Sequence, residues 1–187
     1  TCLNTIMQMV DRIRDTTASH DRCSVVEVMG RRAGYLALNA GIACGATSIL
    51  IPEVEYDFQR DVIDRIRRTQ KTGKKHFVIV VAEGIGGVDE LAKRIQAETG
   101  VESRATVLGH VQRGGVTSGH DRILSSRYGY AAVELAMQGR FGNMVILKGD
   151  QIGYASLEDV IGQENKKVSP DGELVKMAKA FGICFGD

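Results

Sequence analysis

The stretch F-V-I-V-V at positions 77–81 decides the fold class of this 187-residue chain. Five apolar residues in a row are typical of a strand that is covered on both of its faces, as in a parallel sheet. Shorter apolar runs at 23–29, 48–51 and 105–108 predict three further strands, each ended by a glycine or a proline. The sequence therefore predicts several buried strands in one sheet.

Patterns with helical spacing separate these strands, for example the stripe of Val88, Leu91, Ala92 and Ile95. This alternation predicts an α/β fold: a parallel, doubly wound, Rossmann-like sheet flanked by helices. Beyond residue 115 we expect one more strand at 144–147. The helices are expected near 1–15, 35–42, 58–66, 88–100, 121–138, 156–161 and 171–181.

Composition and charge exclude several classes of function. The formal net charge of +1 gives no signature of nucleic-acid or membrane binding, so an anion site must be local. The chain shows neither a membrane-spanning apolar run nor a signal peptide. Its four cysteines form no C-x-x-C pair, which favours free thiols in a reducing, cytoplasmic location. No His, Cys or carboxylate pair has the spacing of metal ligands, so no metal site is predicted in this segment.

Chemically active side chains follow three of the predicted strands. Because the carboxyl ends of parallel strands meet at one edge of a sheet, we expect them to face one pocket. A carboxylate accepts hydrogen bonds from hydroxyls, and guanidinium and imidazole groups hold phosphate, so the set suits a sugar phosphate. These residues are Met29, Gly30 and Arg31 after the first strand, Glu83 after the third, and His110 and Arg113 after the fourth.

Each of these residues also has an ordinary structural explanation when it is taken alone. A methionine after a strand is more often part of a core, and a glutamate at a strand end is more often solvated. Arg113 and His110 could be a solvated arginine beside a turn histidine. Their common placement, rather than any one residue, supports the site.

Three motifs, in this order, resemble bacterial 6-phosphofructokinase. They are H-D-R-C-S-V-V-E-V-M-G-R-R-A-G at 20–34, V-V-A-E-G at 80–84 and R-A-T-V-L-G-H-V-Q-R-G-G at 104–115. The resemblance runs over essentially the whole chain. It implies a cytoplasmic, homotetrameric glycolytic kinase that transfers the γ-phosphoryl group of MgATP to the 1-hydroxyl of fructose 6-phosphate.

The resemblance also implies a role for each residue of the site. Met29, Gly30 and Arg31 would contact the sugar phosphate, and Arg31 would also stabilise charge on the transferred group. Glu83 would bind sugar hydroxyls, while His110 and Arg113 would hold the 6-phosphate. Arg22 and Arg104 match two arginines that reach into the site of a neighbouring subunit.

A second site of the family binds ADP or phosphoenolpyruvate as an allosteric effector. Thr47 stands where the family usually has an acidic residue that helps to hold the effector's magnesium, so we expect weakened or altered activation by ADP. The loop at 71–74 is also one residue longer than the expected K-G-K pattern. The matching positions in this chain are Arg14, Gly45, Lys71, Lys74, Lys75 and His76.

The resemblance covers the C-terminal portion of the enzyme, and the opening helical pattern starts without a cap, so we expect a fragment that lacks the N-terminal part. The GGDG phosphate loop and the T-I-D-N-D loop with the catalytic aspartate are not in this sequence. Mg²⁺ and ATP would be bound mainly by that other part, and the fragment alone would be inactive. Two alternatives remain: a pyrophosphate-dependent phosphofructokinase, and a non-catalytic module that binds sugar phosphates.

The resemblance divides the chain into three segments. Residues 1–113 would form the smaller, substrate-binding α/β domain. Residues 114–162 would return to the larger, nucleotide-binding domain, where apolar helix faces would be left exposed in this chain alone. Residues 163–187 would form a last helix that packs back on the substrate domain.

Overall fold

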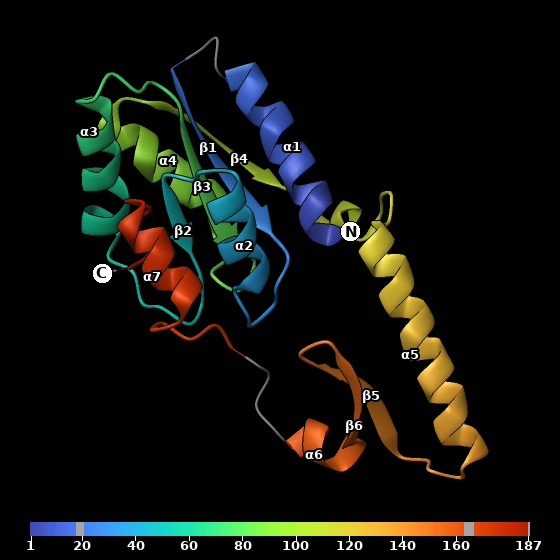
Figure 1. The fold of residues 1–187 in the computed structure, drawn as a ribbon. Helices are drawn as coiled ribbons and strands as arrows, with labels where there is room; N and C mark the ends of the chain where they lie inside the picture. The colour runs from blue at the N-terminus through green and yellow to red at the C-terminus, as the bar shows by residue number, and fades with distance from the viewer. Residues whose placement is uncertain (18–20, 163–166, 187) are drawn as a thin grey trace. The chain divides into compact units, whose positions relative to one another are not determined.

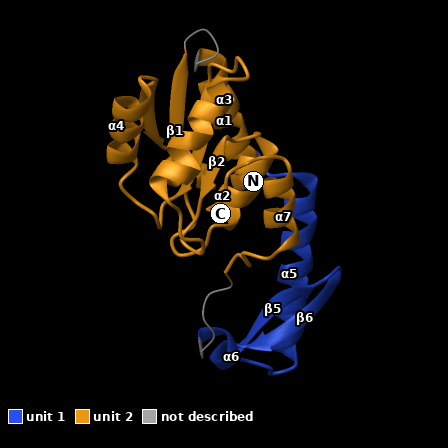
Figure 2. Cartoon of the chain, turned by 90° about the vertical axis from the view of Figure 1, so that its left-hand side faces the viewer, with its two compact units in different colours: residues 1, 116–165 blue, residues 2–115, 166–187 orange. Residues whose placement is uncertain are grey.

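The computed structural model of the chain describes residues 1–17, 21–162 and 167–186. They form two compact units, which Figure 2 distinguishes by colour. Unit 2 contains residues 2–115 and 166–187, and unit 1 contains Thr1 and residues 116–165. The boundary predicted between 162 and 163 adjoins residues 163–166, which lie outside the described residues.

A four-stranded parallel sheet forms the centre of unit 2 (Figure 1). The strands lie in the order β2-β3-β1-β4, so β3, β1 and β4 are consecutive neighbours. The predicted α/β fold is confirmed, although β4 begins three residues before the apolar run that predicted it. The bounds are β1 Arg22–Val28, β2 Ser48–Leu50, β3 Phe77–Ala82 and β4 Glu102–Val107.

Helices cover both faces of this sheet and bury its apolar side chains. One core cluster joins the sheet to α1 (Cys2–Thr17), α2 (Tyr35–Ala43) and α7 (Glu173–Ala180). The other joins it to the π-helical turn η1 (Phe58–Ile63) and to α3 (Asp64–Gln70) and α4 (Val88–Thr99). Unit 2 is therefore a three-layer α/β/α structure.

Strand β3 shows why its sequence is apolar throughout. Phe77, Ile79 and Val81 pack into the cluster with η1, α3 and α4. The alternate residues of the strand, Val78, Val80 and Ala82, pack into the cluster with α1, α2 and α7. Because successive side chains of a strand point to opposite faces, a strand between two helical layers needs apolar residues at every position.

The chain returns to the sheet of unit 2 after α7. Ile49 donates a backbone hydrogen bond to the carbonyl of Cys184 at 2.9 Å, and Cys184 donates to the carbonyl of Thr47 at 3.2 Å. Upstream of α7, the amide of Val168 donates to Glu53 Oε1 at 3.0 Å. These bonds fix the C-terminal segment against the β2 edge of the sheet.

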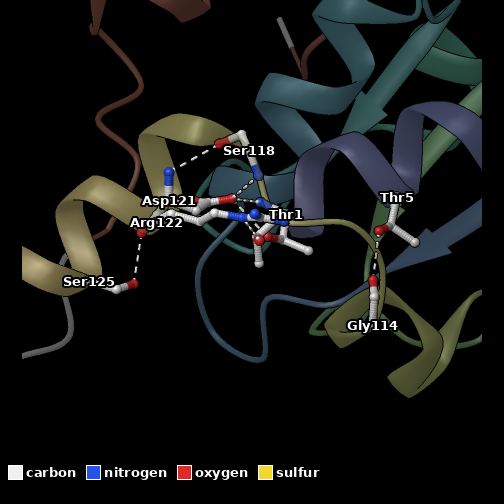
Figure 3. A network of polar contacts seen from close by, with 8 residues as sticks. Thr1, Thr5, Gly114, Ser118, Asp121, Arg122 and Ser125 are labelled. Atoms are coloured by element: carbon white, nitrogen blue, oxygen red, sulfur yellow. Dashed lines mark hydrogen bonds and ion pairs between the residues drawn. The ribbon is translucent and has the colours of Figure 1, made fainter.

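Unit 1 consists of the long helix α5 (Gly119–Met137), an antiparallel hairpin of β5 (Asn143–Lys148) and β6 (Gln151–Ser156), and α6 (Leu157–Gly162). A capping box starts α5: Ser118 Oγ accepts from the amide of Asp121, and the carboxylate of Asp121 accepts from the amide of Ser118 (Figure 3). The hydroxyl of Thr1 also donates to this carboxylate. Apolar side chains of α5 are largely exposed, including Tyr130 and Met137 at 71% and 80%.

Candidate functional site

The predicted site lies where β3, β1 and β4 end side by side. The parallel ladder continues just past these ends, because the amide of Glu83 donates to the carbonyl of Val28 at 2.8 Å. The amide of Leu108 likewise donates to the carbonyl of Glu27 at 3.2 Å. The loops that carry the candidate residues therefore start from a fixed edge of the sheet.

A cleft of about 770 Å³ opens at this edge. Its volume is within the range of about 300–1,000 Å³ that is usual for small-molecule sites. Five of the predicted substrate-binding residues line it, together with two that the sequence did not single out. The lining consists of Met29, Gly30, Arg31, Leu36, Glu83, Gly84 and Arg113.

The carboxylate of Glu83 organises the loop after β1. Its Oε1 accepts hydrogen bonds from the amides of Gly30 at 3.2 Å and Arg31 at 2.5 Å. Its other oxygen has no partner among the described residues and is exposed in the cleft, where it can accept from a ligand hydroxyl. Burial raises the pKa of the nearby Glu27, and the charges of Glu83 and Asp89 raise it further.

The loop that carries Arg31 is strained and closely packed. Arg31 has φ +49°, a left-handed conformation that is uncommon outside glycine and that clusters at ligand sites. Its carbonyl oxygen lies where a side chain on Gly84 would be: a Cβ there would be 2.1 Å away. Glycine at position 84 therefore lets the loops after β1 and β3 approach each other across the cleft.

Gln112 is a positioning residue that the sequence did not single out. It is completely buried in the 3₁₀ turn η2 (Gly109–Arg113). Its Oε1 accepts from the amide of Met29 at 3.1 Å, and its Nε2 donates to the carbonyl of Gly109 at 2.8 Å. The hydroxyl of Thr5 on α1 adds a bond to the carbonyl of Gly114 at 2.8 Å (Figure 3). The turn that presents Arg113 is thus tied to β1 and to α1.

His110 lies on the same turn, but its placement differs from that of Arg113. Its side chain is exposed, and it is not among the residues that line the cleft. Within this chain the structure brings together Arg31, Glu83 and Arg113, and leaves His110 beside the cleft.

Arg22 and Arg104 lie away from the cleft. Arg22 is the first residue of β1, at the amino end of the strand whose other end leads to Met29, and Arg104 pairs in register with Ser24. Glu102 joins the two arginines: its Oε2 accepts from Arg22 Nε at 2.8 Å and its Oε1 from Arg104 Nε at 3.0 Å. These hydrogen bonds lower the pKa of Glu102, and the bond from Arg22 has the larger effect. Sequence reasoning missed Glu102, although its alternation with Arg104 on one strand was a signal.

The residues predicted for the effector site are only partly together. Gly45 and Lys74 line one cavity of about 200 Å³, which Thr47 and Arg65 also line. The guanidinium of Arg14 donates to the carbonyl of Cys44 beside it. Burial, then the charges of Lys74 and Arg14, lower the pKa of His76, which places these cations near its ring. Lys71 and Lys75 do not line the cavity, and Lys75 pairs with Asp21 at 3.5 Å.

Within residues 1–17, 21–162 and 167–186, no three His, Cys, Asp or Glu side chains are grouped in a way that could hold a metal ion. None of the helices in those ranges is long and apolar enough to cross a bilayer.

The family model for phosphofructokinase matches residues 1–136, which include every residue that lines the cleft. The chain belongs to the phosphofructokinase family. The ATP-dependent 6-phosphofructokinases of Bacillus velezensis and Bacillus pumilus are 52% and 46% identical to it over 183 residues. These alignments cover 98% of this chain and 56% of each relative, so the chain spans about half the length of the curated relatives it matches.

Solved phosphofructokinases have the same fold. The structure of the Saccharomyces cerevisiae enzyme matches with a TM-score of 0.80 at 33% identity, over 86% of this chain and 23% of that chain. The Pichia pastoris enzyme in the T-state matches with a TM-score of 0.74 at 33% identity, over 96% of this chain and 21% of that chain. The resemblance noted in the sequence motifs is thus confirmed at the level of the family.

Proposed function

We propose that the chain forms the fructose 6-phosphate site of an ATP-dependent 6-phosphofructokinase, as its C-terminal portion. One observation carries the proposal: Arg31, Glu83 and Arg113, from three neighbouring strand ends, line a single cleft. The cleft offers a carboxylate oxygen for sugar hydroxyls and guanidinium groups for phosphate. The relatives from Bacillus pumilus and Bacillus velezensis are named ATP-dependent 6-phosphofructokinases, which favours ATP over pyrophosphate as the donor.

In this proposal the residues of the cleft bind and orient the sugar. Arg113 holds the 6-phosphate, and Glu83 Oε2 accepts from sugar hydroxyls, while Oε1 keeps the loop of Arg31 in place. Arg31 then faces the end of the sugar that reacts, where its charge can stabilise the transferred group. MgATP supplies the phosphoryl group, and the product is fructose 1,6-bisphosphate. The loops expected to bind MgATP and to act as the base are not in this sequence, so we expect the chain alone to transfer no phosphoryl group.

Assembly and regulation form part of the same proposal. We expect a homotetramer in which Arg22 and Arg104 complete the site of a neighbouring subunit, a role supported by their distance from the cleft of their own unit. ADP or phosphoenolpyruvate would bind near Gly45 and Lys74. With Thr47 in place of an acidic residue, we expect activation by MgADP to be weak.

Binding is tested on the 187-residue chain by titrating fructose 6-phosphate into ¹⁵N-labelled protein. The amides of Gly30 and Gly84 should shift. Arg113→Gln should weaken binding roughly ten-fold or more, because a hydrogen bond to a charged group contributes about 1.5–3 kcal/mol. Arg32→Gln is the matched control, since Arg32 is an exposed neighbour of Arg31 that does not line the cleft. Equal effects of the two substitutions would contradict the proposed site.

Catalysis is tested in a chimera. The matching 183 residues of the Bacillus velezensis enzyme are replaced by this chain, and activity is measured with ATP and with pyrophosphate. We expect ATP-dependent activity, and His110→Ala should raise the KM for fructose 6-phosphate roughly ten-fold. Activity with pyrophosphate alone would assign the other donor. A folded chimera that is inactive with both donors would favour a non-catalytic binding module.

A further inference from the structure

A second cavity, of about 270 Å³, lies at the β2 edge of unit 2 and shares no residue with the sugar-phosphate cleft. Figure 1 shows α3 and α7, which supply three of its five charged side chains, on the side of the sheet where β2 lies. The turn at 182–184 closes it. Its charged lining consists of Arg60, Asp61, Arg65, Arg68 and Lys179.

The charges of this cavity do not balance. Asp61 is the one carboxylate among the described lining residues, and it is completely buried. It accepts hydrogen bonds from Arg60 Nε at 2.6 Å and from the terminal nitrogen of the same guanidinium at 2.8 Å, so these two residues neutralise each other. Arg65 and Arg68 add two further positive charges, which leaves a surplus of positive charge around a small cavity. Such a surplus attracts an anion.

Arg65 connects this cavity with the one lined by Thr47 and Lys74. Arg65, Gly182 and Ile183 line both cavities. A Cβ on Gly182 would lie 3.0 Å from a guanidinium nitrogen of Arg65, so the glycine makes room for that group. Arg65 therefore lies at the junction of two adjoining cavities, where a ligand in either cavity can contact it.

Two buried polar atoms at this junction have no hydrogen-bond partner within the part of the chain that the structure describes. They are Nε of Arg65 and Oγ1 of Thr47, and the Thr47 side chain is only 4% exposed. Buried polar groups are almost always paired, and an exception calls for a partner that is supplied from outside the protein. Phosphate oxygens are suitable acceptors for both atoms.

We propose that the two cavities form one anion site, centred on Arg65, for a compact ligand with two phosphate groups that binds without a metal ion. Each cavity is smaller than the usual lower limit of about 300 Å³ for a drug-sized ligand, so each suits one phosphate group. Guanidinium groups bind phosphate oxygens directly and need no bridging cation. The site overlaps the proposed effector site at Gly45 and Lys74 and adds a subsite, formed by Arg65, Arg68 and Lys179, that the family resemblance does not assign.

Inorganic pyrophosphate is the probe, titrated into the 187-residue chain by calorimetry in the presence of EDTA. Arg65→Gln should raise the Kd for pyrophosphate at least ten-fold. Arg68→Gln should raise it at least three-fold, and this exposed residue is not needed for folding. Arg67→Gln is the control and should leave the Kd within two-fold. Arg67 lies on the same helix but donates to the carbonyl of Glu98 at 2.9 Å and lines neither cavity.

The site of binding is read from the amides of ¹⁵N-labelled protein. Shifts at Gly182 and Ile183, unaffected by saturating fructose 6-phosphate, support the proposal. Shifts at Gly30 that fructose 6-phosphate abolishes would place pyrophosphate in the other cleft and overturn it. It is also overturned if binding requires Mg²⁺, if no binding occurs at millimolar pyrophosphate, or if all three variants keep the parent Kd. Fructose 6-phosphate binding is detected at the amide of Gly30, and pyrophosphate binding at the amides of Gly182 and Ile183. Failure of the proposed sugar-phosphate site can therefore be distinguished from failure of the proposed anion site.

Discussion

Replacing Gln112 with methionine removes two hydrogen bonds from the carboxyl edge of the sheet while nearly keeping the volume of the side chain. The amide of Met29 and the carbonyl of Gly109 then lose their partners. An unpaired buried polar group costs about 1–3 kcal/mol. Both groups belong to half-buried residues, so water can reach them and the lower part of that range applies. We expect a loss of about 2–3 kcal/mol in the free energy of unfolding of unit 2.

Amide hydrogen exchange in β1 and β3 is the suitable assay, because it reports the free energy of opening in unit 2 alone. Since 1.4 kcal/mol corresponds to a factor of ten, exchange at Val26 and Val80 should be about 30- to 150-fold faster in the variant. Gln112→Ala should exchange faster still, because it also leaves a cavity. Gln70→Ala, at an exposed position of α3, is the control and should change exchange by less than about three-fold.

The refuting result is exchange in Gln112→Met within three-fold of the parent. It would mean that water replaces both bonds at no cost, and that the loop of Met29 is held by Glu83 alone. A further distinction comes from ligand binding. If Gln112 positions the loop, fructose 6-phosphate should bind more weakly to Gln112→Met even at low temperature, where both proteins are fully folded.

Three further predictions concern single sites. Gly84→Ala should push the carbonyl of Arg31 away, because the new Cβ would lie 2.1 Å from its oxygen. Titration should then show weaker binding of fructose 6-phosphate. An unchanged affinity would refute the close approach of the two loops. Burial, followed by the charge of Lys74, lowers the pKa of His76 below 6.5. The native state therefore favours the neutral ring, and the free energy of unfolding should decrease as the pH falls below about 6.5. Lys74→Gln should raise the pKa of His76 in an NMR titration and reduce the decrease in the free energy of unfolding at low pH. Burial raises the pKa of Cys23 to about 12, so iodoacetamide at pH 8 should alkylate it only after unfolding; labelling at the unfolded rate in native buffer would contradict this.

The elements that the sequence predicted best are those with the strongest local pattern. β3 was predicted to within one residue, because an apolar run of five residues is too short for a typical helix and is characteristic of a strand covered on both faces. β6 (Gln151–Ser156) was missed: it contains Gly153, and none of its side chains is fully buried, so its pattern is weak. The stripe from Phe58 to Ile66 predicted a helix but not the π-helical turn of η1, in which the amide of Asp64 bonds to the carbonyl of Gln59, five residues earlier.

The site residues, like the secondary-structure elements, were predictable where the local sequence pattern was strong. Arg31, Glu83 and Arg113 could be predicted because each follows an apolar run, and the parallel sheet then brings the strand ends together. Gln112 could not, because its role depends on Met29, 83 residues away in the sequence. The pairing of Glu102 with Arg104 had a local signal, but its bond to Arg22, 80 residues away, did not. A buried glutamine within a polar turn has no local pattern that distinguishes it from a solvated one. Hydrogen bonds between distant segments are therefore the part of the site that only the structure supplies.

The sheet also determines where Arg104 can act. Arg104 pairs with Ser24, and Arg22 begins the strand that leads to Met29. Seven residues of strand, at about 3.3 Å each, separate Arg22 from Met29 by roughly 23 Å. Arg104, level with Ser24, lies five residues or roughly 17 Å from the level of Met29. An arginine side chain spans neither distance, so neither cation can serve the cleft of its own unit. Arg104→Ala should therefore leave fructose 6-phosphate binding to the monomeric chain unchanged and raise the KM roughly ten-fold in the assembled chimera. Equal effects in both would mean that Arg104 acts within its own chain, and the shared site would have to be abandoned.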